Sequence, residues 1–276
     1  MTAVEQPEDP GELIPVDDPE QPIRFSRLKL FSKSPAHFAA ALPEESSALD
    51  VGSAAHAMIL GVGREVIAYP GKVRRGKEWE AFQGDHPDAL ILTKAEYGRA
   101  SRMAKAVNDN ADARRVLDGI REQTMFWKLN GRLCRGTPDV RSDQFVTELK
   151  TGETSDPRFF PFKMRRFRYD AQLAWYSDGA VLAGHPDPKE HYVVAVEAAY
   201  PHVVTVFKVT RWIANGRKSL RLWWERLLQC EAANEWPGYS QSVVDLDPLE
   251  EELEMLDAGE VAAARPDWAD GEPPFA

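Results

Sequence analysis

Residues 136–152 read GTPDVRSDQFVTELKTG, and the predicted sheet is centred on this stretch. Asp139 precedes Glu148 by nine residues, and Lys150 follows Glu148 by two. Because alternate side chains of a strand point to the same face, Glu148 and Lys150 are expected to share a strand face. Two carboxylates and an ammonium gathered at adjacent strand ends suit Mg²⁺-dependent phosphodiester cleavage.

The segment around this stretch is rich in strand-forming residues. Asn130-Gly131 is a strong signal for a tight turn between two antiparallel strands, so it predicts a β-hairpin. Asp139 and Glu148 are therefore expected on neighbouring strands. The predicted strands cover residues 126–129, 133–135 and 144–147.

An Asp followed at a loose distance by Glu-x-Lys is a common pattern, and a chain of this length should show roughly one match by chance. The alternative interpretation is a surface hairpin with a solvated Asp and a Glu/Lys pair. A lone His56 in the small and apolar run 50–60 would usually be a core residue. Gln172 and Tyr176 are four residues apart and share a helix face, as in many ordinary helices.

The order of these motifs resembles that of the PD-(D/E)XK nuclease superfamily. Within it, the chain is most similar to the RecE-like exonucleases of phages and prophages, over about residues 25 to 240. The ordered motifs are Gly-x-x-x-His (52–56), Glu122 before a strand, Gly-x-Pro-Asp (136–139), Glu-x-Lys-Thr-Gly (148–152) and Tyr-x-x-Gln-x-x-x-Tyr (169–176). Further likenesses are SPAHF (34–38), RGKEW (75–79), LTKAE (92–96) and WPGY (236–239).

The resemblance implies an α/β (α+β) fold with a restriction-endonuclease-like core, in which helices flank a mixed central sheet. The pattern along the chain agrees with that architecture and shows no internal repeat. Helices are expected near residues 27–42, 50–60, 94–117, 168–182 and 212–233, with later strands at 191–199 and 203–209 and a polar connection between residues 60 and 94.

The resemblance also implies a magnesium site. Asp139 and Glu148 would ligate Mg²⁺, with Mn²⁺ as a substitute, together with the backbone carbonyl of Leu149. His56 would complete or adjoin the coordination shell. Lys150 would orient the attacking water and stabilise charge on the phosphorus in the transition state, as an electrostatic group rather than a base.

Three further residues receive open assignments from the resemblance. Glu122 would either bind a second metal or position His56 or Lys150. Gln172 and Tyr176 would align either the metal-bearing strand or the substrate strand.

Basic residues gather in two places. The denser set is interleaved with Phe162 and Phe167, and it would hold a phosphate backbone or form a solvated helix face. The second set lies in a Gly-flanked loop, which either contacts the entering duplex or is only exposed. The two sets are Lys163, Arg165, Arg166 and Arg168, and Arg74, Arg75 and Lys77.

The formal net charge of −10 is unevenly distributed. Residues 1–22 hold seven acids and no Lys or Arg, and residues 243–276 hold eleven acids and one Arg. Residues 23–242 therefore carry 33 basic and 26 acidic side chains, and we predict a basic nuclease domain there. The two tails are predicted to be acidic and mostly disordered, with a short acidic helix at 246–256. Either the tails aid solubility, or one of them competes with DNA for the basic groove or docks a partner protein.

Two absences in the sequence bear on location and cofactors. No apolar run approaches the length of a membrane span, and no signal-peptide pattern opens the chain, so a cytoplasmic protein is expected. Cys134 and Cys230 are the only cysteines. They fit a reducing compartment and are too few for the four-cysteine iron–sulfur cluster of some superfamily members.

The expected activity is that of a Mg²⁺-dependent exodeoxyribonuclease that resects double-stranded DNA ends in the 5′→3′ direction for homologous recombination. The polarity, a ring-shaped homo-oligomer and a single-strand annealing protein as partner are implied by the RecE likeness alone. The alternatives are a structure-specific endonuclease or single-strand nuclease on the same fold, and a catalytically silent DNA-binding scaffold for recombination.

Overall fold

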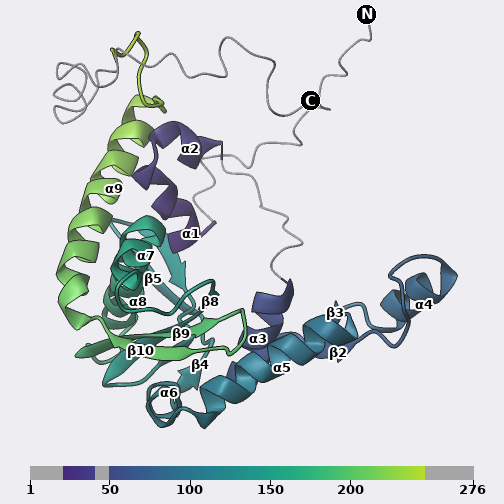
Figure 1. Ribbon diagram of the computed structural model, residues 1–276. Coiled ribbons are helices and arrows are strands. Elements are labelled where there is room, and N and C mark those ends of the chain that lie inside the picture. The colour runs from purple at the N-terminus through teal and green to yellow at the C-terminus, as the bar shows by residue number, and fades with distance from the viewer. Residues whose placement is uncertain (1–20, 41–49, 246–276) are drawn as a thin grey trace, which may run out of the picture. The chain divides into compact units, whose positions relative to one another are not determined.

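A mixed five-stranded sheet, in the order β10–β9–β8–β7–β4, forms the centre of the fold (Figure 1). β8 and β9 run parallel, and the other neighbours are antiparallel. The computed structural model describes residues 21–40 and 50–245. The strands are β4 (Ile120–Arg121), β7 (Val140–Arg141), β8 (Phe145–Gly152), β9 (Glu190–Glu197) and β10 (Val204–Lys208).

Helices cover both faces of this sheet, as a buried parallel strand pair requires. Val146 of β8 faces one hydrophobic core and Leu149 faces the other, because their side chains point to opposite faces. The predicted mixed α/β architecture is confirmed. The first core is covered by α7 (Phe160–Phe167), α8 (Tyr169–Leu182) and α9 (Ile213–Ala233), and the second by α3 (Asp50–Leu60), α5 (Lys94–Asp109) and α6 (Ala111–Val116).

The predicted hairpin is present, but it belongs to a separate three-stranded sheet. β5 (Met125–Leu129) and β6 (Arg132–Gly136) are joined by Asn130 and Gly131, whose φ angles of 48° and 81° suit a tight hairpin turn. β1 (Ile23–Arg24) pairs in parallel with β6. The hairpin therefore packs on α8 rather than extending the central sheet.

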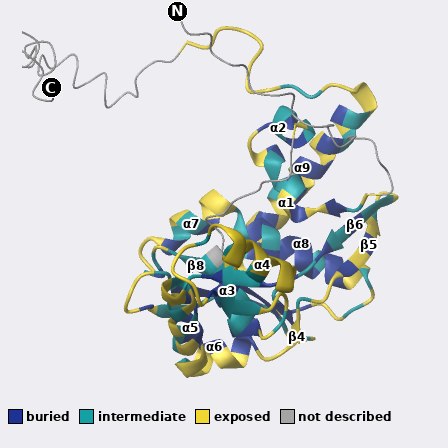
Figure 2. Cartoon of the chain, turned by 90° about the vertical axis from the view of Figure 1, so that its right-hand side faces the viewer, coloured by how far each residue is buried: buried dark blue, intermediate teal, exposed yellow. Residues whose placement is uncertain are grey.

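The prediction of a polar connection between residues 60 and 94 is wrong. This segment contains two short parallel strands and a helix, and Tyr69 packs edge-on against Trp79 and Phe82. Strands of three residues carry too little periodicity to be read from a sequence. Figure 2 shows α4 as exposed, and none of its residues is buried. The elements are β2 (Val66–Ala68), α4 (Lys77–Asp85) and β3 (Leu90–Leu92).

Two predicted helices are divided by capping residues. The helix predicted over 94–117 is interrupted at Asn110, whose side chain accepts a hydrogen bond from the N–H of Ala113 and starts a new helix. At the N-terminal end, Ser34 caps a helix that begins with Pro35. The pieces there are α1 (Phe25–Leu28), a 3₁₀ helix (Lys29–Ser32) and α2 (Pro35–Ala39), and a second 3₁₀ helix (Thr210–Trp212) precedes α9.

The predicted tails fall mainly outside the described residues. This holds for most of residues 1–22 and of residues 243–276, and for the predicted helix at 246–256. Residues 237–245, the described part of a second unit, contain no helix or strand. Within residues 21–40 and 50–245, no helix has the length and apolarity needed to cross a bilayer.

A buried histidine on β9 should make the stability depend on pH. His191 is 4% exposed and its Nε2 lies 2.8 Å from Ser177 Oγ. Burial, with a smaller contribution from the charge of Arg217, lowers its pKa to about 4. The unfolded chain then binds a proton more readily than the native chain, so the unfolding free energy should fall as the pH drops from about 6.5 to about 4.

Urea unfolding of the wild type and of His191→Gln measures this effect. Between about pH 7.5 and about pH 5, the wild type should lose about 2 kcal/mol more stability than the variant. Other titrating groups cancel in the comparison, because both chains contain them. Parallel stability curves for the two chains would contradict the assignment of His191 as a proton-sensitive core residue.

Candidate active site

The structure brings together the residues that the sequence motifs single out, from five parts of the chain. β8 contributes the acid and the lysine of Glu-x-Lys, and the loop that enters β7 contributes the other acid. The remaining residues come from α3, from the end of β4 and from α8. The assembled residues are His56, Glu122, Asp139, Glu148, Leu149, Lys150, Gln172 and Tyr176.

Strand pairing holds the two acids opposite each other. Val140 of β7 pairs with Thr147 of β8, which places Asp139 beside Glu148. The N–H of Asp139 donates to Glu148 Oε1 at 3.2 Å, and the N–H of Leu149 donates to Asp139 Oδ2 at 2.6 Å. Each carboxylate is thus oriented by a backbone donor from the other strand, which fixes both before any ligand arrives.

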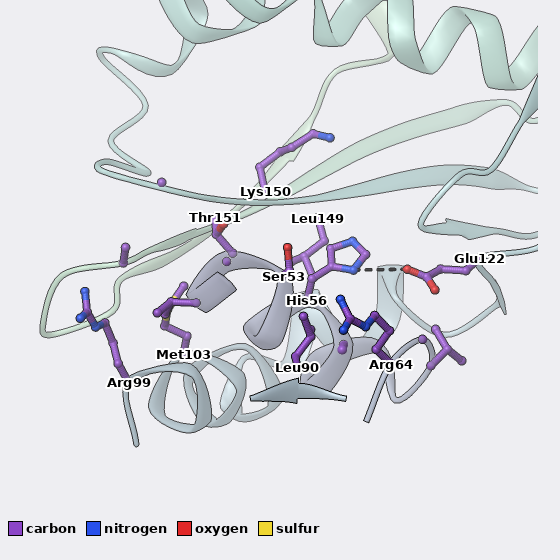
Figure 3. Close-up of a pocket in the computed structure, with 17 residues that line it drawn as sticks. Ser53, His56, Arg64, Leu90, Arg99, Met103, Glu122, Leu149, Lys150 and Thr151 are labelled. Carbon is purple, nitrogen blue, oxygen red and sulfur yellow. Dashed lines mark ion pairs between the residues drawn. The ribbon is translucent and has the colours of Figure 1, made fainter. Parts of the chain in front are cut away.

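His56 connects Asp139 to Glu122. Its Nε2 lies 3.0 Å from Asp139 Oδ1. Its Nδ1 lies 3.4 Å from Glu122 Oε1, and Figure 3 marks this second pair. Burial alone would lower the pKa of His56, but the hydrogen bond and charge of Asp139, aided by the charge of Glu122, raise it above its usual value. His56 therefore adjoins the acid pair as a hydrogen-bond partner of Asp139.

A close approach of α3 to β8 explains the glycine in the Gly-x-x-x-His motif. A Cβ atom on Gly52 would lie 2.9 Å from Thr151 Oγ1, closer than side chains tolerate. Because Gly52 has no Cβ, α3 can lie against the end of β8. This packing brings His56, one turn further along α3, within reach of Asp139.

Lys150 lies at the centre of a chain of polar side chains. Its Nζ donates to Glu148 Oε2 at 2.7 Å and to Gln172 Oε1 at 3.1 Å, and it lies 5.0 Å from the centre of the Tyr169 ring. Gln172 Nε2 in turn donates to the Tyr176 hydroxyl at 3.2 Å. Burial would lower the pKa of Lys150, but the charges of Glu148 and Asp139 outweigh it and raise that pKa. Lys150 is therefore a fixed cation.

Glu148 is the most constrained acid of the site. It is 1% exposed, and burial, followed by the charge of Asp139, raises its pKa in spite of the opposing effect of Lys150. Two carboxylates this close are unfavourable unless a cation compensates them. Divalent cations such as Mg²⁺ bind through one or two carboxylates and keep several waters. The donor set of Asp139, Glu148 and the Leu149 carbonyl therefore fits such an ion.

These donor atoms suit a divalent cation by their chemistry, but they are not already arranged around a metal position. Among the residues that the structure describes, no group of three or more His, Cys, Asp or Glu side chains is arranged to hold a metal ion. Asp139 and Glu148 instead direct their oxygens at backbone N–H groups, His56 and Lys150. Glu122 reaches the site through His56.

Two cavities meet at Lys150. The larger, of about 790 Å³, is bordered by His56, Glu122 and Lys150, and Figure 3 shows Arg99 at the end opposite Glu122. The smaller, of about 400 Å³, has a basic and aromatic lining. Several of the basic residues that line these cavities have no local signal in the sequence, because they come from distant segments. They are Arg64 and Arg99 in the larger cavity and Arg24, Lys29 and Arg135 in the smaller one.

The predicted basic residues differ in how accessible they are. Arg165, Arg166, Arg75 and Lys77 are exposed, whereas Lys163 is half-buried and donates to the Thr154 carbonyl at 3.1 Å.

Two arginines of the predicted sets are engaged within the protein. Arg168 turns inward, where it pairs with Asp170, bonds Ser219 and stacks over Trp223. Arg74 pairs with Glu96. Arg168 therefore ties α8 to α9, whereas its predicted phosphate contact stays a prediction.

The family match covers most of the chain. Residues 24–245 match the model of a family described as a PDDEXK-like domain of unknown function (DUF3799). Among curated proteins, no match to the chain was found.

Solved structures also match the chain, and the following two are among them. The crystal structure of a protein named "Putative exonuclease" from Eubacterium rectale has a TM-score of 0.60 and 14% sequence identity, over 93% of this chain and 100% of that one. That of a protein named SSO0001 has a TM-score of 0.25 and 11% identity, over 66% of this chain and 88% of that one, which is too low to inform the fold. At its low identity, the first likeness concerns the fold.

The family description and the shared fold agree with the Asp139, Glu148 and Lys150 arrangement. Together they support a nuclease. The chain belongs to the PDDEXK-like family DUF3799, and so to the PD-(D/E)XK nuclease superfamily.

Proposed function

We propose that the chain is a metal-dependent deoxyribonuclease whose hydrolytic centre is formed by Asp139, Glu148 and Lys150. The observation that carries this proposal is the pair of adjacent, backbone-oriented carboxylates with a half-buried lysine bonded to one of them. A solvated surface hairpin would not bury Glu148 to 1% exposure beside another acid. The alternative of a surface hairpin is therefore disfavoured.

Asp139 and Glu148 would hold the divalent ion, Mg²⁺ or Mn²⁺, with the Leu149 carbonyl. When bound, that ion supplies a bound water of lowered pKa and shields the charge of the scissile phosphate. His56 holds Asp139 in place through its Nε2, and the backbone N–H of Leu149 fixes the second oxygen of the same carboxylate. The carboxylate of Asp139 is therefore already oriented before the reaction, so no free energy is spent on reorienting it during the reaction.

Lys150 would stabilise the negative charge that develops on the phosphate oxygens. It remains protonated, because the neighbouring acids raise its pKa, and so it acts as a cation rather than as a base. Gln172 fixes the ammonium through its Oε1, and the Tyr176 hydroxyl accepts a hydrogen bond from the amide of Gln172. Gln172 and Tyr176 are therefore positioning residues for Lys150, and Glu122 positions His56.

We propose further that the enzyme is an exonuclease that resects double-stranded ends 5′→3′ for homologous recombination. The resemblance to RecE-like enzymes supports the whole of this assignment, and the printed name of the Eubacterium rectale protein, which shares the fold, supports only the exonuclease part. The same resemblance supports a ring-shaped homo-oligomer around the duplex and a single-strand annealing partner. A structure-specific endonuclease, a single-strand nuclease and a silent scaffold remain distinct outcomes of the experiment below.

Digestion of linear and covalently closed circular duplex DNA with Mg²⁺ tests this assignment, with separate 5′ and 3′ end labels. Loss of linear DNA alone, with the 5′ label released first, is expected. Release of the 3′ label first would indicate digestion in the 3′→5′ direction instead. Cleavage of the circles would instead indicate an endonuclease, and binding without any cleavage would indicate a scaffold.

The exposed arginines of α7 should contribute to the salt dependence of DNA binding. Each neutralised phosphate contributes about one unit to the slope of log K against log salt concentration. Arg165→Gln combined with Arg166→Gln should therefore lower the magnitude of the slope by about two. Fluorescence anisotropy with a duplex in EDTA measures it, and Arg221→Gln, at an exposed position on α9, is the matched control. An unchanged slope would make α7 a solvated helix face.

A further inference from the structure

The outer face of α7 carries aromatic rings that the fold does not need. Phe160 and Met164, on the inner face, are 3% and 1% exposed and belong to the core. Phe159 and Phe162 are 55% and 66% exposed. An amphipathic helix normally presents polar residues at such positions, because exposed rings gain nothing from the core. The two outer rings therefore require another explanation.

Positive charge surrounds these rings. Residues 157–169 contain five basic side chains and no acid, but two of the five are paired within the protein, Arg158 with Asp156 and Arg168 with Asp170. Lys163 and Arg166 follow Phe159 at positions +4 and +7, so they share its helix face with Phe162. The Arg158 guanidinium lies 5.6 Å from the centre of the Phe159 ring. Rings and cations thus alternate along one continuous surface, defined by Phe159, Phe162, Lys163 and Arg166 and called here the α7 surface.

The α7 surface adjoins the end of the strand that carries Glu148 and Lys150. Lys163 Nζ donates to the carbonyl of Thr154, and a Cβ atom on Gly152 would lie 3.1 Å from this Nζ. At the other end of α7, Phe167 lines the smaller cavity together with Lys150 and stacks on Tyr169. A DNA strand that leaves the candidate active site along β8 would therefore meet α7.

The combination of exposed rings and cations on the α7 surface favours single-stranded over double-stranded DNA as its ligand. Phosphates of a duplex are bound by Lys and Arg without any aromatic ring, because the base faces of a duplex are stacked on each other. Unpaired bases expose their faces, and single-strand binding proteins combine a basic track with aromatic side chains on which bases stack. Guanidinium groups packed on rings add cation–π stabilisation.

We propose that the α7 surface binds unpaired nucleotides of the DNA strand next to the catalytic strand. Phe159 and Phe162 stack on the bases, while Lys163 and Arg166 contact the phosphates. The proposal rests on the proposed nuclease function, because that function supplies the DNA and its proximity. It adds a ligand class, single-stranded DNA, and it separates the role of the rings from that of the charges.

Anisotropy with two fluorescent probes in EDTA tests the proposal on the full chain. One probe is an oligothymidylate of about 15 nucleotides, and the other is an abasic oligonucleotide with the same number of phosphates. Phe159→Ala combined with Phe162→Ala should weaken oligothymidylate binding roughly tenfold or more and leave abasic binding and the salt slope unchanged. Leu222→Ala, at a 65% exposed site on α9, is the matched control and should change neither.

A second pair of variants separates stacking from apolar contact. Phe159→Leu with Phe162→Leu keeps the apolar surface and should lose as much affinity as the Ala pair, whereas Phe162→Trp should retain it. Equal losses on both probes, or none on the oligothymidylate, would overturn the proposal. So would variants that lose binding to anionic phospholipid vesicles and not to the oligonucleotide. Thermal unfolding midpoints verify that all the variants are folded.

The outcome is separable from that of the nuclease proposal. If the wild type cleaves no DNA and the Ala pair still loses base-dependent binding, the α7 surface stands and the nuclease assignment fails. If the wild type cleaves DNA and the Ala pair binds oligothymidylate normally, only the α7 surface fails.

Discussion

Asp139→Asn is expected to lower the rate of DNA cleavage on the order of a thousandfold or more, with the fold and the DNA affinity retained. The substitution preserves the shape of the side chain and one oxygen that can accept from the N–H of Leu149. It removes the charge that would bind the divalent ion together with Glu148. Loss of Lewis-acid stabilisation is worth several kcal/mol, which corresponds to a rate loss of this size.

Single-turnover cleavage of a labelled duplex measures the rate, and anisotropy in EDTA measures the affinity. Asp143→Asn is the matched control, because Asp143 is exposed in the turn between β7 and β8 and touches none of the site. It should cleave DNA at the wild-type rate. Near-normal cleavage by Asp139→Asn, in a folded chain, would remove Asp139 from the hydrolytic centre.

Lys150→Met should lower kcat about a hundredfold or more and change KM little. The substitution keeps the length and the apolar stem of the side chain and removes the ammonium. A preorganised group that acts on charge developed only in the transition state affects kcat rather than substrate binding. The variant also leaves Glu148 buried beside Asp139 without its cation, so some loss of stability is expected.

Steady-state kinetics separates these parameters, and the thermal unfolding midpoint shows whether the variant is folded at the assay temperature. Lys128→Met, at an exposed position on β5, is the matched control and should change neither parameter. A Lys150→Met enzyme with normal kcat and raised KM would make Lys150 a residue that binds ground-state phosphate. Normal values of both kcat and KM in Lys150→Met would show that Lys150 takes no part in the reaction.

The acid pair and the lysine were predictable because their geometry is local. Pairing of neighbouring strands places Asp139 beside Glu148, and strand alternation places Lys150 on the face of Glu148. The contacts of His56 and Gln172 with this group depend on how α3 and α8 pack, and spacing alone does not give them. The order of the motifs supplied those residues, and the close approach at Gly52 gives the physical reason for one of them.

The errors in the predicted fold have equally specific causes. β2 and β3 have three residues each, too few for an alternating pattern to appear. Asn110 interrupts a helix whose apolar periodicity continues across it, because its side chain caps the next segment. The ion pair of Arg168 with Asp170 is likewise invisible in the basic run of the sequence, because it depends on the packing of α8 against α9. Local sequence does not encode these tertiary partners.

Asp139 and Glu148 are proposed to bind a divalent cation on which DNA cleavage depends. Cleavage of an end-labelled linear duplex by the wild type and by Glu148→Gln, in Mg²⁺, in EDTA and after Mg²⁺ is restored in excess, tests this dependence. Cleavage by the wild type should stop in EDTA and return with Mg²⁺, and the variant should not cleave the duplex. Cleavage in EDTA, cleavage by the variant, or a folded wild type that binds DNA and cuts none with Mg²⁺ or Mn²⁺ would contradict it.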